Sequence, residues 1–309
     1  MPTKEALLAG DVRALARAIS LVEDQQPAAV ELLRAIFPHT GAATVIGLTG
    51  APGSGKSSLV DRLAARYRAT DHKVGIIAVD PSSAFSGGAI LGDRIRMQSH
   101  TADPSVFIRS MATRGHLGGL ARATNDAIDL MDAAGFDPVI VETVGVGQDE
   151  VDVVKTADVV AVVLVPGMGD DIQAIKAGIL EIADLFVINK ADHKGADRLQ
   201  ADLAYMLELT DRETAKPEIL RTVAIRNEGI DRLHDGIASF MSNTGRSRRR
   251  ERRRDRAEAR FRAVLVERLL RRVVERALPA DELGRLIDAI AARELDPYTA
   301  AERVTRSLE

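Results

Sequence analysis

The segment that most constrains the fold of this chain is Gly50-Ala-Pro-Gly-Ser-Gly-Lys-Ser57. It matches the pattern G-x-x-x-x-G-K-[ST], a glycine-rich loop whose successive backbone N–H groups converge on phosphate oxygens. An apolar run at Thr44–Leu48 precedes the loop and a helical pattern at Ser57–Arg68 follows it. The sequence therefore places the loop between a strand and the N-terminus of a helix, which attracts anions. A chance glycine turn is disfavoured in this context.

Individual residues of this loop have separate expected roles. Lys56 adds positive charge at the β- and γ-phosphates of a nucleotide, and the Ser57 hydroxyl can ligate Mg²⁺. The remaining phosphate contacts are expected from neighbouring positions of the same segment, namely Gly50, Ala51, Pro52, Gly53, Ser54, Gly55 and Ser58.

Apolar runs alternate with helical stretches after this point, which predicts an α/β fold. The runs are continuously apolar, as expected for strands covered on both faces of a mostly parallel, doubly wound sheet. This is the architecture of a P-loop NTPase. One run, Val106–Met111, could pair antiparallel at an edge. The strand candidates are Thr44–Leu48, Val74–Val79, Val106–Met111, Val139–Val141, Val159–Val165, Leu185–Ile188 and Leu220–Val223.

Three zones are expected along the chain. Residues 1–40 form an N-terminal helical extension in which Asp11 caps a helix, and residues 41–243 form the nucleotide-binding domain. Residues 244–309 begin with an arginine-rich run that continues into an apolar stripe at helical spacing, which favours a long amphipathic helix. Because acidic residues interrupt the basic run and aromatic residues are missing from it, we expect no nucleic-acid partner.

Composition excludes several classes of protein. The 309 residues include no cysteine, so disulfides, thiolate metal sites and cysteine nucleophiles are ruled out. The longest purely apolar run, Val159–Val165, is far short of the roughly 20 residues that a membrane helix needs. Glu5 and Asp11 argue against a targeting leader. We therefore expect a cytoplasmic protein without a membrane partner.

The segment Asn189-Lys190-Ala191-Asp192 follows an apolar strand late in the sheet, where a doubly wound fold binds the base of a nucleotide. An acidic acceptor such as Asp192 can pair with the N1–H and amino group of guanine, a donor pattern that adenine lacks. Lys190 could lie along the base, and Asn189 could join this loop to the phosphate loop. Ala224 and Ile225, after the last strand, are candidates for a second wall. GTP is therefore preferred over ATP.

Groups that could sense the γ-phosphate lie between these two motifs. Asp80 and Glu142 each end a strand candidate, the arrangement in which a carboxylate holds Mg²⁺ directly or through water. Asp93 is a third carboxylate, on a loop. Any of the three could instead cap a helix. Gly145 would offer its N–H to the γ-phosphate, and Gln148 is an offset candidate for orienting the attacking water.

Seven short segments occur in an order that is similar to one family. They are Gly50–Ser58, Val79–Ser83, Ser86–Gly88, Gly92–Arg94, Arg114–Gly119, Glu142–Gln148 and Asn189–Asp192. Together they resemble the MeaB/ArgK/MMAA family of P-loop GTPases over nearly the whole chain.

The resemblance implies a homodimeric GTPase, paired through the C-terminal arm, that serves an adenosylcobalamin-dependent acyl-CoA mutase, typically methylmalonyl-CoA mutase. It would gate cofactor delivery and protect or reactivate the mutase, meeting adenosylcobalamin only through that partner. Asp80, Asp93 and Glu142 would be the metal-sensing carboxylates, with Lys56 and Ser57 at phosphate and Mg²⁺. The Pro166–Lys176 loop resembles a third switch, in which Gln173 and Lys176 signal to the mutase.

Rival functions remain. The name ArgK is associated with a phosphorylating component linked to transport, and we rank this function second. A nickel-type metallochaperone GTPase shares this branch, but cysteine or clustered histidine ligands are missing. A ParA/MinD-type ATPase would place lysine at Ala51, and a small-molecule kinase would prefer ATP.

Overall fold

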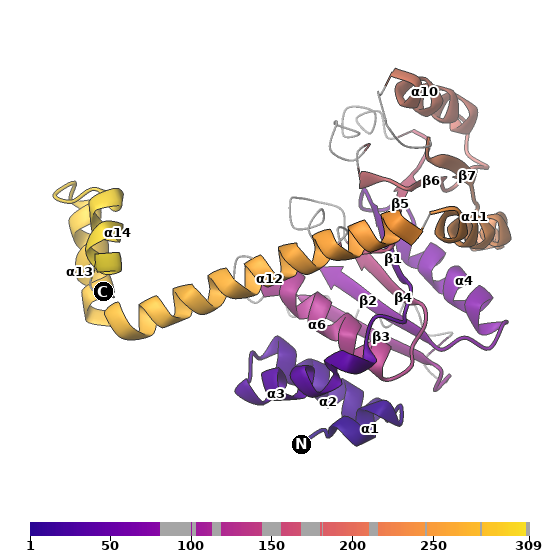
Figure 1. Cartoon of the computed structure of the whole chain (residues 1–309). Coiled ribbons are helices and arrows are strands. Elements are labelled where there is room, and N and C mark those ends of the chain that lie inside the picture. Colours follow the sequence, from indigo (N-terminus) through magenta and orange to yellow (C-terminus); the bar gives the residue numbers. More distant parts are fainter. Residues whose placement is uncertain are drawn as a thin grey trace. The chain divides into compact units, whose positions relative to one another are not determined.

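The computed structural model contains a seven-stranded parallel sheet with helices on both of its faces (Figure 1). The structure describes residues 1–80, 100, 103–112, 119–143, 156–167, 180, 182–209, 216–244, 246–278 and 280–306. The chain divides into two compact units, Met1–Arg249 and Arg250–Glu309. Each unit is described by itself below.

The strands run parallel in the order β3-β2-β4-β1-β5-β6-β7. Their bounds are Val45–Gly50 for β1, Val74–Asp80 for β2, Val106–Ala112 for β3, Val139–Thr143 for β4, Val159–Leu164 for β5, Leu185–Ile188 for β6 and Glu218–Arg221 for β7. The chain builds one half of the sheet up to β4 and then crosses β1 to build the other half from β5. Strand β1 therefore stands at the switch point, where doubly wound sheets bind ligands beyond their carboxyl ends.

The edge strand β3 corrects one expectation. It pairs parallel to β2 along its whole length, from Val74↔Val106 to Asp80↔Ala112, so an antiparallel arrangement at this edge is wrong. A long connection between the two strands allows the chain to return to the same end of the sheet, as a parallel pair requires.

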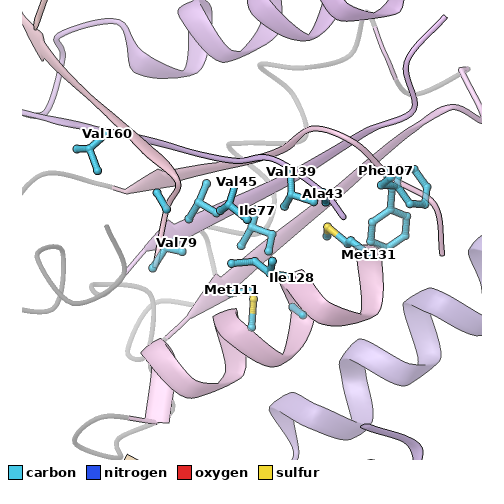
Figure 2. Close-up of a cluster of buried hydrophobic side chains, with 14 of the residues drawn as sticks. Ala43, Val45, Ile77, Val79, Phe107, Met111, Ile128, Met131, Val139 and Val160 are labelled. Carbon is cyan, nitrogen blue, oxygen red and sulfur yellow. The ribbon is translucent and has the colours of Figure 1, made fainter. Parts of the chain in front are cut away.

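Helices cover both faces of the sheet, and each face has its own apolar core. On one face α4 (Lys56–Arg68) and α11 (Ile230–Asn243) pack together against side chains such as Ile46 and Ile76. On the other face α6 (Gly119–Ala133) and α10 (Ala196–Leu209) cover neighbours of those residues, including Val45 and Ile77. Figure 2 shows Ile77, Met111 and Met131 within this second core. Alternate residues of one strand thus enter opposite cores, which explains the continuous apolar runs.

The N-terminal helices are part of the same unit. They are α1 (Lys4–Leu8), α2 (Val12–Glu23), α3 (Pro27–Ile36) and the short 3₁₀ helix η1 (Phe37–His39). Asp11 Oδ1 accepts hydrogen bonds from the N–H groups of Arg13 and Ala14, which confirms the expected N-cap. Helices α2 and α3 both pack on α6. The extension therefore shares the main hydrophobic core.

The second unit contains most of α12 (Arg246–Ala277), followed by α13 (Ala280–Ala291) and α14 (Pro297–Arg306). The predicted apolar stripe of α12 is exposed, with Phe261 65% and Leu269 53% accessible. Within the described ranges, no helix combines the length and apolar character that crossing a membrane requires.

Candidate nucleotide-binding site

The glycine-rich loop connects β1 to α4 and depends on glycine at three positions. Gly50, Gly53 and Gly55 have φ values of 148°, 77° and 87°, a region that residues with a side chain rarely adopt. A side chain at Gly50 would meet the carbonyl of Val163 on β5. Gly55 is the N-cap of α4 and supplies no capping oxygen. The first N–H groups of α4 are consequently offered to a ligand, as at anion sites.

Lys56 is the first residue of α4 and folds back over this loop. Its side chain is only 5% exposed, and Nζ donates hydrogen bonds to the carbonyl oxygens of Gly50 at 2.6 Å and Ala51 at 3.0 Å. Burying an ammonium group costs free energy unless the group is hydrogen-bonded, and the two carbonyl oxygens supply these hydrogen bonds. The arrangement holds a positive charge inside the loop, at the place where an anionic ligand would meet it.

The other named loop residues differ in exposure. Pro52 and Gly53 are exposed at the turn and Ser58 is exposed on α4, whereas Ser54 is fully buried and Ala51 and Ser57 are partly buried. The loop thus has an accessible tip above a packed base.

Ser57, in the first turn of α4, is hydrogen-bonded to Glu142 on β4. Ser57 Oγ donates a hydrogen bond to Glu142 Oε1 at 2.7 Å, and Glu142, near the carboxyl end of β4, is 4% exposed. A hydroxyl group that uses its proton in this way keeps two lone pairs for another partner. Hydroxyl and carboxylate oxygens are the donors that Mg²⁺ prefers. The residues present therefore fit a magnesium ion beside the phosphate loop.

The other predicted carboxylate and switch residues are placed only in part. Asp80 is the last residue of β2 and Glu142 is the residue before the last of β4, so the two lie on neighbouring strands at one end of the sheet. The side chain of Asp80 lies outside the described residues, as do Asp93, Gly145, Gln148, Gln173 and Lys176. Within the described part of the chain, no group of three or more histidine, aspartate or glutamate side chains could hold a metal ion.

Asn189 joins three segments of the site through its buried amide. Its Nδ2 donates to the carbonyl oxygen of Ser54 at 2.8 Å, while its Oδ1 accepts from Thr222 Oγ1 at 3.1 Å and from the N–H of Ala224 at 3.2 Å. Asn189 is 2% exposed. The loop after β6 is therefore joined to the phosphate loop and also to the segment after β7.

Lys190 adds a second link to the phosphate loop. Its backbone adopts a φ of 54°, and its Nζ donates to the carbonyl oxygen of Gly53 at 2.9 Å. The side chain consequently runs from the loop after β6 toward the tip of the glycine-rich loop, across the space between them.

Asp192 lies beside an arginine. Arg226 Nη2 is 3.2 Å from Asp192 Oδ2, and Arg226 Nε is 3.2 Å from Glu228 Oε1. Ala224 is buried and Ile225 is 76% exposed in the short 3₁₀ helix η4 (Ala224–Arg226). A cavity of about 420 Å³ lies between these segments, and its lining includes Asp192, Val223 and Arg226.

Two of these residues carry no recognisable signal in the sequence. Thr222 is one threonine among many in the sequence and is identified only by its hydrogen bond to Asn189. Arg226 comes 34 positions after Asp192, and nothing in that spacing links them. The sequence does contain the alternation of charges at Arg226 and Glu228, which permits the pairing but does not indicate it.

Comparisons with known proteins agree with this geometry. Residues 15–277 match the family described as methylmalonyl-CoA mutase-associated GTPase MeaB. A protein of Pyrococcus abyssi that carries the word GTPase in its name is 50% identical, over 98% of this chain and 95% of the relative. GTPase ArgK of Escherichia coli is 38% identical, over 75% of this chain and 72% of the relative.

Two further similarities extend the comparison. The mouse methylmalonic aciduria type A homologue, named as mitochondrial, is 37% identical over 76% of this chain and 61% of its own length. A crystal structure titled LAO/AO transport system kinase superposes with a TM-score of 0.72 and 28% identity, covering 99% of this chain and 96% of that one.

Proposed function

Because the chain belongs to the MeaB family of methylmalonyl-CoA mutase-associated GTPases and is itself a GTPase, we propose that it serves an adenosylcobalamin-dependent acyl-CoA mutase. In this role it gates the delivery of intact cofactor to the mutase and protects or reactivates that enzyme. Methylmalonyl-CoA mutase is the expected partner, as the family description suggests. Adenosylcobalamin is met only through the mutase.

The observation that carries the nucleotide part of this proposal is the buried contact between Asn189 and the Ser54 carbonyl. It fixes a phosphate-binding loop and a candidate base-binding loop at one end of the sheet, so that a single nucleotide can reach both. The reaction converts GTP and water to GDP and phosphate. Such chemistry depends almost entirely on positioning and charge stabilisation.

Lys56 and the first turn of α4 act on the phosphates in this proposal. On binding, the Lys56 ammonium exchanges its hydrogen bonds to the Gly50 and Ala51 carbonyls for β- and γ-phosphate oxygens. The backbone N–H groups from Gly53 to Ser58 receive the remaining oxygens, at the N-terminus of a helix.

Ser57 and Glu142 would hold Mg²⁺, with Asp80 and Asp93 as further carboxylates near it. A bound Mg²⁺ would supply charge neutralisation at the phosphate oxygens. The Ser57 hydroxyl continues to donate its proton to Glu142, so the lone pairs of Ser57 Oγ stay available for another partner.

Asp192 reads the base in this proposal, by accepting from the N1–H and amino group of guanine. The stem of Lys190 lies along one face of the base, and Ala224 with Ile225 forms the other wall. Adenine presents no equivalent pair of donors to a carboxylate, so GTP is selected.

The sequence of the switch segments suggests slow turnover in isolation. Gly145 is assigned to the γ-phosphate and Gln148 to the attacking water, at an offset from the position where small GTPases carry a glutamine. The mutase accelerates hydrolysis by ordering these segments, and Gln173 and Lys176 carry the signal between the two proteins.

The second unit is proposed to pair two copies of the chain. The apolar stripe of α12, which includes Phe261, Leu265 and Leu269, is exposed in the single chain. Burial of such a stripe against a second copy is favourable and closes the surface. Light scattering on the purified protein tests this, and a monomer at micromolar concentration would contradict the homodimer.

Steady-state GTP hydrolysis with and without purified methylmalonyl-CoA mutase tests the proposal. We expect the mutase to raise turnover several-fold and to co-elute with the protein in the presence of GTP. Lys56→Ala removes the phosphate-binding ammonium and should abolish both nucleotide binding and the acceleration. Equal turnover with and without the mutase, and no co-elution, would contradict the mutase role.

The transport-linked alternative is favoured by one observation, the similarity to the structure titled LAO/AO transport system kinase. It predicts transfer of the γ-phosphoryl group to another protein. Radiolabelled GTP incubated with cell extract distinguishes the two functions: label retained on a protein supports the transport role, and label released only as free phosphate supports the mutase role.

A further inference from the structure

The carboxylate assigned to the base is already engaged by Arg226. The guanidinium approaches Asp192 Oδ2 through Nη2 and Glu228 Oε1 through Nε, both at 3.2 Å. The side chains of Asp192 and Arg226 are 30% and 50% exposed, so water reaches the pair. Arg226 and Asp192 also line the same cavity. The arginine is therefore already paired with the carboxylate that is assigned to the base.

A guanidinium and the edge of guanine offer a carboxylate the same chemistry. Each presents adjacent N–H donors in one plane, and a carboxylate accepts such a pair on its two oxygens. Arg226 thus imitates the donor edge of guanine. Both cannot use Asp192 fully at one time, so nucleotide binding must weaken or break the ion pair.

Hydrogen bonds hold the backbone around Arg226 in place, so the movement is assigned to its side chain. The turn that carries Arg226 is closed by two hydrogen bonds, from Val223 N–H to the Glu228 carbonyl at 3.0 Å and from Glu228 N–H to the Val223 carbonyl at 3.3 Å. The N–H of Ala224 is held by Asn189. Glu228 contacts the guanidinium on the side of Nε, so the charge remains paired when Asp192 is released.

We propose that Arg226 is a competitor for the base-reading carboxylate: it holds Asp192 in the empty protein, keeps only its pair with Glu228 when guanine binds, and recaptures Asp192 as GDP leaves. The proposal rests on the proposed role of Asp192 in reading guanine. Its consequence is faster exchange of nucleotide, because the departing base is replaced at once by an internal donor.

The test compares GDP binding by the full chain and by Arg226→Ala, using calorimetry for Kd and stopped-flow release of a fluorescent GDP for the dissociation rate. A partly exposed ion pair contributes little, so we expect Kd to fall and release to slow by about two- to five-fold in Arg226→Ala. Arg226→Gln, which keeps a long polar side chain without the charge, should behave in the same way.

Three controls separate this competition from a general loss of charge. Arg66→Ala removes a cation that is paired with Asp231 and does not line this cavity, so GDP binding should not change. In an Asp192→Asn background, Arg226→Ala should have no effect, since the competition needs the carboxylate. Raising the salt concentration should bring the Kd values of the unaltered protein and Arg226→Ala together, because salt screens exposed pairs.

The outcomes are distinguishable. No GDP binding by the unaltered chain would overturn the proposed function itself. Normal GDP binding that weakens or stays equal in Arg226→Ala would overturn only the competition, and weaker binding would instead indicate that Arg226 contacts the base. An effect of equal size in the Asp192→Asn background would overturn it as well.

Discussion

Replacement of Asn189 by alanine should both destabilise the protein and separate the two halves of the nucleotide site. The side chain is 2% exposed and makes hydrogen bonds to the Ser54 carbonyl, the Thr222 hydroxyl and the Ala224 N–H. Asn189→Ala removes all of these contacts at once. It leaves two buried backbone groups and one buried hydroxyl without that partner.

The expected magnitude follows from these contacts. A typical intramolecular hydrogen bond contributes about 1 kcal/mol net, and a buried group left without a partner costs about 1–3 kcal/mol. Allowing for water that enters the space vacated by the amide, we expect Asn189→Ala to lower the free energy of unfolding by about 3–5 kcal/mol. That is a large fraction of the roughly 5–15 kcal/mol that stabilises a domain.

Urea denaturation followed by far-ultraviolet circular dichroism measures this loss, since the chain contains no tryptophan to report unfolding. GDP affinity, measured on the same samples, should fall because the phosphate loop and the base loop are no longer joined. Asn243→Ala is the matched control: it removes one exposed hydrogen bond to Ser239, at the end of α11, and should cost less than about 0.5 kcal/mol.

Asn189→Asp separates the contributions of the amide. It keeps an acceptor for Thr222 and Ala224 but turns the donor toward the Ser54 carbonyl into a charged acceptor. We expect it to be at least as destabilising as Asn189→Ala. A loss below about 1 kcal/mol in Asn189→Ala, or unchanged GDP affinity, would refute the reasoning that Asn189 holds the two loops together.

Three further predictions concern the loop, the start of the sheet and alkaline pH. Gly55→Ala puts a side chain at a φ of 87° and against the amide of Asn189, so we expect the free energy of unfolding, measured in urea, to fall by about 1–2 kcal/mol and GDP binding to weaken. Unchanged values of both would contradict this strain. Asp132 accepts backbone N–H hydrogen bonds from residues 41–43, so Asp132→Ala should lower the free energy of unfolding by about 2–4 kcal/mol and leave GDP affinity unchanged. Amide hydrogen exchange at residues 41–43 should become faster, and unaltered exchange would contradict the prediction. Burial raises the pKa of Tyr67 to about 12, so its contribution to stability is present below the unfolded value of about 10 and is lost as pH rises from there toward 12. Tyr67→Phe should remove that alkaline loss and the tyrosinate absorbance that develops near pH 12, and an identical pH profile would show that burial does not restrain the phenol.

The sequence predicted the elements of the nucleotide domain because their signals are local. The glycine-rich loop, the strand before it and the helix after it lie within a few residues of one another. The strand ends at Asp80 and Glu142 were also visible as apolar runs that stop at a carboxylate. Local patterns of this kind can be recognised without knowing the order of the strands in the sheet.

The direction of β3 could not be predicted in the same way. The run Val106–Met111 contains the polar residues Arg109 and Ser110, a pattern that fits an edge strand of either direction. In the structure the Arg109 guanidinium donates to Glu23 and to Ser20 Oγ, so α2 covers this edge. The polar residues reflect a contact with a helix nearly ninety positions earlier, which the pattern of the strand itself does not contain.

Contacts between distant loops were predicted only in part. The sequence placed Asn189 and Asp192 in the base-binding loop, and the predicted link from Asn189 to the phosphate loop is confirmed by its hydrogen bond to the Ser54 carbonyl, but the partners of both residues after β7 were not predicted. Thr222 and Arg226 are defined by strand order, which brings β6 and β7 side by side. Pairing across parallel strands is a property of the assembled sheet, so it requires the structure.

Calorimetry with GDP and with ADP, in the presence of magnesium, tests the central claim most directly. If the glycine-rich loop holds the phosphates and Asp192 reads the base, GDP should bind with measurable heat and ADP at least about 100-fold more weakly, and Asp192→Asn should reduce that difference. Absence of heat for GDP, or equal affinity for ADP, would contradict the account.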